Sequence, residues 1–297
     1  MSLPAGETAA LATAFCWVMS ALFFGAAGRR IGSLPVNLVR LVLAVPLLSL
    51  VTLALRGQAL PLDASAEAWA WLSLSGVIGL AFGDLCLFRA FVDAGPRLAT
   101  LVMAFAPAVA ALTGWVWLGE RLGGTDLAGM ALTFGGIVLA VVSRDRTAGT
   151  QGPALKRGIT LAALGAVGQG VGLVVGKRGM GSYDPIAATQ IRIYAGLGAF
   201  VLLFTLTRRW GLVARGLRDR RALRDTSIGT IFGPVIGVSL SLVAIQHTET
   251  GVAAAIMATS PVLILPFAIV MEKERVGPGG LVGAVLACAG VALLFLR

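Results

Sequence analysis

Residues 98–122 (LATLVMAFAPAVAALTGWVWLGERL) and residues 253–276 (AAAIMATSPVLILPFAIVMEKERV) carry the same sequence pattern. Each is an apolar stretch with a proline in its first half and a Glu-Arg pair near its end. About 20 apolar residues are enough to cross a bilayer as a helix. A shift of 154 residues aligns 90–140 with 244–294 without a gap, and it pairs Met103 with Met257 and Pro107 with Pro261. The chain therefore contains two copies of one helical unit.

The composition indicates an integral membrane protein. Of the 297 residues, 57% are hydrophobic and 13% are charged, which is about half the charge of a typical soluble domain. The net charge of +10 does not indicate a nucleic-acid partner, because Lys and Arg cluster at the ends of apolar segments, as at Arg29 and Arg30. Such clusters set membrane topology and contact lipid headgroups. Membrane lipids are therefore the expected partners, and nucleic acid is not.

Ten apolar stretches, bounded by charged residues, Gly or Pro, predict ten transmembrane helices. We place them at residues 8–27, 35–55, 67–91, 96–117, 124–143, 157–176, 185–207, 226–246, 251–271 and 278–296. The polar segment 144–156 predicts a linker between a first five-helix repeat at 1–143 and a second at 157–297. Because five is an odd number, the second repeat enters the membrane from the opposite side. The predicted fold is an all-α membrane protein of two inverted repeats.

The repeated pattern resembles a known family once residues 79–94 (GLAFGDLCLFRAFVDA) and Trp17 are added. The sequence is similar to the drug/metabolite transporter superfamily, in its EamA-like ten-helix branch, over nearly the whole chain. The resemblance implies a monomeric ten-helix basket in the inner membrane, with a central substrate cavity. These patterns identify the superfamily and leave the substrate open.

The distribution of basic residues predicts the orientation. Three arginines lie within predicted spans, and of the other 21 Lys and Arg the odd-numbered loops hold 16. The longest loop, Arg208 to Arg224, is strongly basic and is expected to lie along the membrane surface. Cytoplasmic loops carry the excess of Lys and Arg. Both termini are therefore predicted on the outer face.

Charged residues inside spans are costly and usually face a cavity or a partner. Asp84 lies about seven residues, or roughly 10 Å, from the end of the third span. Arg40 lies at a similar depth in the second span, measured from the same face, so the two are predicted to pair. Two roles are open for such a pair. It could break when substrate binds or when Asp84 is protonated, or it could be a permanent structural ion pair.

Arg192 holds the place in the seventh span that Arg40 holds in the second. The position that matches Asp84 in the second half is Val238, so the repeat supplies no acid there. Arg192 is therefore expected to meet an anionic substrate group such as a carboxylate. The alternative is that Arg192 reaches to the interface or binds a lipid phosphate. Arg89 lies nearer the membrane surface, and its side chain is expected to reach to the interface.

Two prolines are expected to kink the fourth and ninth spans. Pro107 and Pro261 lack a backbone N–H, which frees the carbonyls of Met103 and Met257 four residues earlier. Free carbonyls at membrane depth need a polar or water-filled neighbour, so the cavity is expected beside these spans, with both methionines lining it. The alternative is that the kinks serve packing alone.

Weaker candidates and the glycines complete the set of residues singled out. Each polar group is expected to satisfy a neighbouring helix rather than bind substrate, and Trp17 is retained as a substrate-site candidate through the family resemblance. The polar groups are Asn37, Gln169, Gln190, Tyr194, Gln246 and His247. Glycines spaced by four or seven residues allow close helix contact, and those spaced by seven are expected to join the last helices of the two halves. They are Gly168, Gly172 and Gly176, with Gly129, Gly136, Gly283 and Gly290 in those last helices.

The expected function is secondary transport of a small polar or amphipathic metabolite, such as an amino acid, by alternating access, with export as the favoured direction. No cofactor is implied, because no phosphate-binding GxxxxGK[ST] loop is present. An enzyme is not expected, since the sequence offers no His-based nucleophilic set, and Cys16, Cys86 and Cys288 fit apolar packing. The alternatives are a non-transporting membrane protein and an integral-membrane enzyme that acts on a lipid.

Overall fold

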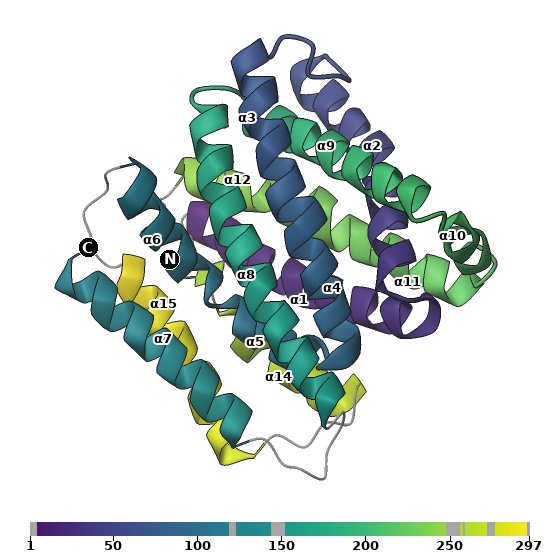
Figure 1. Cartoon of the computed structure of the whole chain (residues 1–297). Coiled ribbons are helices and arrows are strands. Elements are labelled where there is room, and N and C mark those ends of the chain that lie inside the picture. The colour runs from purple at the N-terminus through teal and green to yellow at the C-terminus, as the bar shows by residue number, and fades with distance from the viewer. Residues whose placement is uncertain are drawn as a thin grey trace.

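The computed structural model describes residues 5–118, 123–143, 152–247, 256–257, 259–271 and 277–295, and all regular structure in these ranges is helical (Figure 1). The first half contains α1 (Ala5–Ile31), α2 (Ser33–Arg56), α3 (Ala66–Gly76), η1 (Val77–Gly83), α4 (Asp84–Asp93), α5 (Pro96–Met103), α6 (Ala106–Leu118) and α7 (Gly124–Val142). The second half contains α8 (Pro153–Met180), α9 (Pro185–Leu206), α10 (Trp210–Gly216), α11 (Arg220–Thr230), η2 (Ile231–Gly237), α12 (Val238–His247), α14 (Ser260–Met271) and α15 (Pro278–Phe295).

The helices are those of a multi-pass membrane protein. Six are long and apolar enough to cross a bilayer, at Ala5–Ile31, Ser33–Arg56, Ala66–Asp93, Pro96–Trp117, Pro153–Met180 and Pro185–Leu206. Two shorter apolar helices lie at Leu127–Val142 and Pro278–Leu293. Each of the ten predicted spans overlaps a helix, although the ninth, predicted at 251–271, falls partly outside the described residues.

The predicted long loop between residues 208 and 224 is shorter than expected. It contains the separate helix α10, and α11 already begins at Arg220 instead of at 226. Asp219 ends the loop because its carboxylate accepts hydrogen bonds from the backbone N–H groups of Arg221 and Ala222, both at 3.0 Å. An aspartate at this position satisfies donors that have no partner inside the helix.

The third helix of each half shows that the sequence repeat extends to the structure. The continuous run α3–η1–α4 covers 66–93, and α11–η2–α12 covers 220–247, again 154 residues later. Both runs contain a seven-residue π-helical segment at the same place. A π-helix is rare and is often found at functional sites. Its occurrence in both halves marks it as a feature of the repeat unit.

The two halves are intertwined, since the first helix of each packs against the third helix of the other. Helix α8 packs along α3, η1 and α4, and α1 packs along α11, η2 and α12. Small residues permit this approach, as predicted: a Cβ atom on Gly172 would lie 3.0 Å from the Cα atom of Gly79. Figure 1 shows α8 beside α3 and α4 along their length. The core is therefore built mainly from contacts between halves.

The two ends of the molecule differ. Near the turn that follows α1, this helix also packs against α2, α4 and α5 of its own half. A Cβ atom on Gly25 would lie 2.6 Å from the Pro96 ring, and one on Gly28 would lie 2.9 Å from Val92. Within the described residues, α8 makes no comparable contact with α9 or α12. The end that holds Ile31 and Asp93 is therefore closed by α1, and α8 makes no matching closure within its own half in the described residues.

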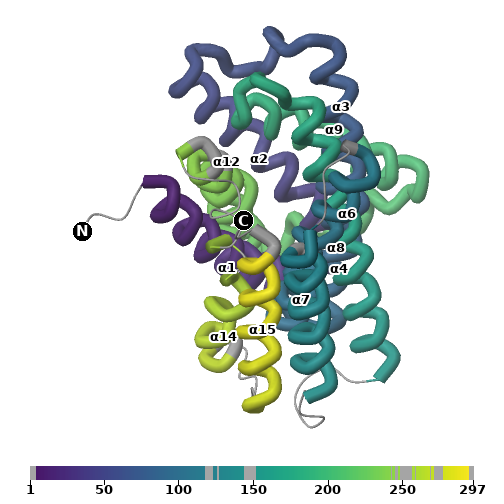
Figure 2. The backbone as a smooth tube through the Cα atoms, turned by 90° about the vertical axis from the view of Figure 1, so that its left-hand side faces the viewer, coloured from purple at the N-terminus to yellow at the C-terminus, as the bar shows by residue number. Residues whose placement is uncertain are grey.

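Helices α7 and α15 pack against each other over their whole length, as the glycine spacing predicts (Figure 2). A Cβ atom on Gly136 would lie 2.6 Å from the carbonyl oxygen of Gly283, and one on Gly290 would lie 2.7 Å from that of Gly129. The last helices of the two halves thus meet through their backbones.

Replacing Gly136 with valine is expected to destabilise the protein. The added side chain must push α15 away, and overpacking of this kind costs about 1–3 kcal/mol. Thermal unfolding in detergent would measure the loss. Gly135 provides the control, because a Cβ atom there meets no other atom within 4 Å. The Gly135→Val variant should keep the wild-type melting temperature, and equal losses in both variants would contradict this interface.

Candidate functional site

A buried polar cluster lies at the centre of the helical core. Arg40 of α2 and Asp84 at the start of α4 are 4% and 5% exposed, and they form the predicted ion pair between Arg40 Nη2 and Asp84 Oδ2. Gln169 of α8 donates from Nε2 to the other oxygen of Asp84, at 2.6 Å. Both carboxylate oxygens are thus occupied, one by a residue from the first half and one by a residue from the second.

The π-helical segment η1 supplies backbone acceptors to the same cluster. Arg40 Nη2 lies 3.4 Å from the carbonyl oxygen of Leu80, and Gln169 Nε2 lies 3.3 Å from that of Gly79. The wider turn of a π-helix departs from the regular α-helical ladder, which is how side chains gain access to these carbonyls. Gly79 and Gly83 of this segment are buried in protein, whereas Val77 and Phe82 are exposed.

Asn37 and two aromatic rings fix the orientation of Arg40. Asn37 accepts from Arg40 Nε at 3.2 Å, and its own amide donates to the Asp84 carbonyl oxygen at 3.3 Å. The guanidinium carbon of Arg40 lies 4.7 Å from the centre of the Phe88 ring and 5.9 Å from that of Phe24. Cation–π contacts of this kind stabilise a desolvated cation. Arg40 is therefore held by hydrogen bonds, a carboxylate and ring faces together.

Arg192 turns into the protein and not toward a membrane surface. Its guanidinium lies beside two glycines: a Cβ atom on Gly79 would be 3.4 Å from Nη2, and one on Gly176 would be 3.9 Å from Cζ. Its Nε atom is buried and has no hydrogen-bond partner among the described residues. The side chain as a whole is partly exposed, so its terminal nitrogens reach accessible space. A cation in this setting is expected to bind an anion.

The charges around Asp84 do not balance. Within electrostatic reach of this carboxylate, the described residues bring two arginines, Arg40 and Arg192, and no second acid. Val238 opens α12 at the position where Asp84 opens α4. The repeat therefore gives Arg192 no carboxylate of its own, and the described residues around Asp84 bring one more cation than they bring acids.

The two prolines interrupt their helices as predicted. The fourth span is broken at Ala104 and Phe105, between α5 and α6, and Pro107 is the second residue of α6. Pro261 is likewise the second residue of α14. Ala104 and Phe105 donate to carbonyls three residues back, both at 3.1 Å, which tightens the chain before the break.

The expected role of Met257 requires correction. Its carbonyl was expected to face a polar cavity, but it accepts a hydrogen bond from the Ser260 hydroxyl at 2.8 Å. The Met257 side chain is 8% exposed and packs with Ala9, Ala10 and Ala244. The Ser260 hydroxyl is the polar neighbour of this carbonyl, and the buried Met257 side chain packs among alanines instead of lining a cavity. Ala106 occupies the place of Ser260 in the first half and has no hydroxyl, and Met103 there is partly exposed.

Gln190 and Tyr194 lie away from the cluster. The Gln190 amide donates to Ser49 Oγ at 2.9 Å, to the Ala59 carbonyl at 2.8 Å and to the Tyr194 hydroxyl at 2.8 Å. These bonds join α2, the loop that follows it and α9, and Tyr194 stacks on Trp69. Both residues thus satisfy neighbouring elements.

The remaining sequence candidates do not join the cluster in the described residues. Trp17 is 39% exposed and lies against η2, where a Cβ atom on Gly237 would be 3.1 Å from its ring. His247 is exposed at the end of α12, with Nδ1 3.0 Å from the Val243 carbonyl oxygen. Gln246 lies in the same helix, and its side chain falls outside the described part of the structure.

The sequence analysis missed an ion-pair group at the closed end. Asp93, which is 4% exposed at the end of α4, accepts two hydrogen bonds from Arg157 of α8, at 2.7 and 3.0 Å. Arg89 donates to the same carboxylate at 3.0 Å, and its side chain is 42% exposed. A two-pronged arginine–carboxylate contact is among the stronger ion pairs. This group fastens α8 to the third helix of the other half.

A second polar tie lies at the opposite end, between the loops that follow α2 and α8. Asp63 accepts from Arg56 at 2.6 Å and from the Tyr183 hydroxyl at 2.8 Å. Burial, and then the bond to Asp63, raises the pKa of Tyr183 to about 12. The bond from Tyr183 holds the pKa of Asp63 below its ordinary value. At neutral pH the donor is therefore protonated, the acceptor is charged, and the tie is intact.

Comparison with known proteins agrees with this architecture. A sequence model of the EamA-like transporter family matches residues 4–142 and 156–296, so both halves of the chain match it separately. One crystal structure superposes with a TM-score of 0.60 at 20% identity, over 99% of this chain and 97% of its own. Similarity at that level establishes the fold alone. A search of curated proteins found no match.

Proposed function

Because the chain belongs to the EamA-like transporter family, we propose that it is a secondary transporter that exports a small polar or amphipathic metabolite, such as an amino acid. Members of this family are membrane transporters and not enzymes. The proposal includes ten membrane crossings, a monomer in the inner membrane, and no cofactor. The observation that carries it is the excess positive charge at the centre of a fold built from two repeats.

Arg192 is the residue that recognises substrate in this proposal. Its Nε atom has no partner in the described residues, and its terminal nitrogens are accessible. A substrate carboxylate would satisfy these donors and neutralise the excess charge, since an arginine fork matches a carboxylate with two parallel hydrogen bonds. Gln169, whose amide oxygen lies near Gly79, stands close enough to contact the same ligand.

The difference between the two ends supports alternating access. Helix α1 closes against α2, α4 and α5, whereas α8 has no comparable contact with α9 and α12 in the described residues. In a protein of inverted repeats, the second state arises when the two halves exchange their arrangements. The second state would therefore have α8 packed against α9 and α12, with α1 released.

The closed end is the basic end, so the positive-inside rule assigns it to the cytoplasm. The present arrangement would then be closed to the cytoplasm. A cysteine introduced at Ser182, in the loop after α8, should react with a membrane-impermeant thiol reagent added outside intact cells. One introduced at Arg218 should be protected. The reverse pattern would overturn the proposed orientation.

Transport is tested in two steps. A metabolite panel is first screened by thermal stabilisation of the purified protein, since a ligand that binds only the folded state raises its melting temperature. Each compound that stabilises the protein is then loaded into proteoliposomes. Its release is compared with release from liposomes that lack the protein. Protein-dependent release of a stabilising carboxylate supports the proposal. Binding without release, or turnover of a membrane lipid without flux, would instead favour the non-transporting or enzymatic alternative.

A further inference from the structure

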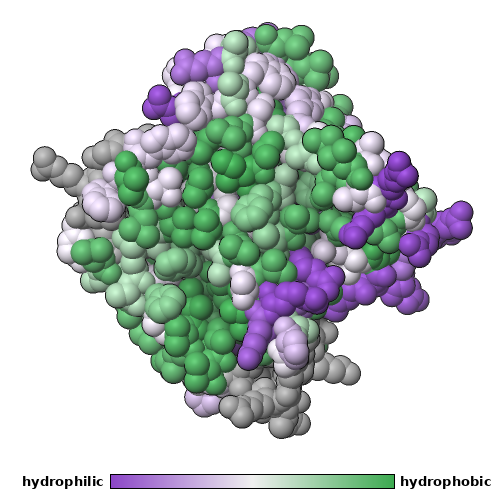
Figure 3. Space-filling model, in the orientation of Figure 1, coloured by the Kyte–Doolittle hydropathy of each residue, from purple (hydrophilic) through white to green (hydrophobic). Residues whose placement is uncertain are grey.

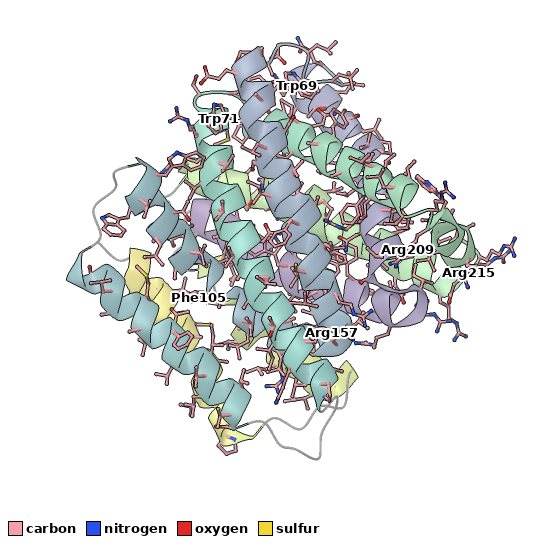
Figure 4. All side chains as sticks on the ribbon, in the orientation of Figure 1. Trp69, Trp71, Phe105, Arg157, Arg209 and Arg215 are labelled. Carbon is pink, nitrogen blue, oxygen red and sulfur yellow. The ribbon has the colours of Figure 1, made fainter. Side chains whose placement is uncertain are left out.

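Seven arginines gather at one corner of the molecule, around α10 and the start of α11. They are Arg208, Arg209, Arg215, Arg218, Arg220, Arg221 and Arg224, and all seven are exposed. Figure 3 shows a hydrophilic patch at this edge, directly beside the apolar surface of the membrane helices. Figure 4 shows Arg209 and Arg215 pointing outward there. We call these seven residues the arginine corner.

The arginine corner is anchored to the core by α10. Val213 of α10 is buried against α2 and α9, and a Cβ atom on Gly216 would lie 3.2 Å from Ile31 and 3.5 Å from Pro35. Trp210 anchors the start of the helix, with its ring 5.6 Å from that of Phe204 and its N–H 3.3 Å from the Thr205 hydroxyl. The outward arginines therefore project from an ordered base.

The acids of this corner are already engaged. Asp219 caps α11 and also accepts from Arg30 at 3.0 Å, and Asp225 is buried and accepts from Arg224 at 3.0 Å. The N–H of Ala222 and the guanidinium of Arg30 hold the pKa of Asp219 below its ordinary value, so it stays charged and capping. Arg208, Arg209, Arg218, Arg220 and Arg221 make no ion pair with any described residue. The corner thus keeps a large positive charge that the protein does not neutralise.

We propose that the arginine corner binds the phosphate headgroups of anionic phospholipid in the adjoining leaflet. The site stands where α9 ends and α11 begins, so its arginines lie at the level where a spanning helix leaves the hydrocarbon. Exposed Leu206, Leu217 and Trp210 flank the charges with apolar surface suited to acyl chains. Arginine binds phosphate through two donors, and a tryptophan prefers the membrane interface.

The corner is connected to the closed end of the core. Gly216 rests on the turn between α1 and α2, and Asp219 binds Arg30 at the end of α1. Lipid bound at the arginine corner therefore steadies the segment that closes the basic end. This inference does not depend on the identity of the transported substrate, because its test measures lipid binding.

The test compares two double variants of the full chain in neutral detergent. Arg209→Gln with Arg215→Gln removes two charges from the corner, and Lys177→Gln with Arg178→Gln removes two exposed charges from the opposite end. Binding of phosphatidylglycerol and of phosphatidylcholine is measured by native mass spectrometry and by thermal stabilisation. Each arginine near an anionic lipid surface contributes about fivefold in affinity, so the corner variant should bind phosphatidylglycerol about 25-fold more weakly.

The control variant should bind phosphatidylglycerol as the wild type does, and phosphatidylcholine should bind all three proteins alike. A third arm uses inorganic phosphate alone. Equal stabilisation by inorganic phosphate and phosphatidylglycerol would overturn the proposal in favour of a free-anion site. Equal loss of phosphatidylglycerol in the two double variants would also overturn it, because the effect would then follow net charge and not the corner. Unchanged far-ultraviolet circular dichroism shows that each variant has folded.

Discussion

Replacing Arg192 with alanine is expected to abolish measurable binding of a carboxylate-bearing substrate while leaving the protein folded. Truncating one member of a buried charged contact costs about 2–5 kcal/mol of binding, or at least roughly thirtyfold in affinity. Arg192 Nε is buried without a hydrogen-bond partner among the described residues, so its removal should leave the melting temperature unchanged or slightly higher. The readout is ligand-dependent stabilisation, measured beside the dissociation constant of the wild type.

Two controls make this result specific. Arg192→Lys keeps the charge but loses the planar two-donor geometry, so it should retain only weak binding. Arg178→Gln removes an exposed arginine that stacks on Trp71 at 5.0 Å and should bind as the wild type does. If the same ligand stabilises Arg192→Ala and the wild type equally, Arg192 is structural and the proposed substrate class is wrong.

Replacing Asp84 with alanine is expected to lower the stability of the protein, in contrast to the Arg192→Ala variant. It removes the only acid described near Arg40 and Arg192, and a buried charge left without its partner costs about 3–5 kcal/mol. The protein should therefore unfold at a much lower temperature or fail to accumulate. Unfolding in a graded series of denaturing detergent measures the loss, with Glu67→Gln as an exposed control on α3.

The double variant Asp84→Leu with Arg40→Leu separates stability from switching. Removing both partners of a buried pair is often neutral or stabilising, so this variant should recover much of the stability lost in Asp84→Ala. It should still lack transport if the pair opens during the cycle. Normal transport with normal pH dependence in Asp84→Asn would remove the switching role and leave a permanent structural ion pair.

The ion pair of Arg40 and Asp84 could be predicted from the sequence because the depth of a residue in a membrane helix follows from its distance along the chain from the helix end. Arg40 and Asp84 lie on consecutive spans that share a membrane face, and the rise of 1.5 Å per residue converts sequence position to depth. The repeat placed Arg192 in the seventh span where Arg40 stands in the second. It could not show that the long side chain turns inward past Gly79 and Gly176, because that direction depends on the neighbouring helices.

Other features of the site were invisible in the pattern. Gln169 approaches Asp84 only because α8 packs along the third helix of the other half, 85 residues away in sequence. The π-helical segments have no distinct hydrophobic period, since both lie in uniformly apolar runs. In the sequence, Asp93 is an acidic residue at the end of a span, and nothing there indicates its ion pair with Arg157, 64 residues away.

The sequence by itself determined the membrane character, the repeat and the helix breaks at Pro107 and Pro261. These follow from composition, periodicity and the missing proline donor, which act within one or two helical turns. The tertiary structure alone decided which helices of opposite halves meet, which end α1 closes, and that Arg56 Nη1 and Arg192 Nε are buried without a partner among the described residues. Those outcomes depend on how glycine-lined helices fit against each other in three dimensions, and contacts between distant segments leave no local signal in a chain that is apolar almost throughout.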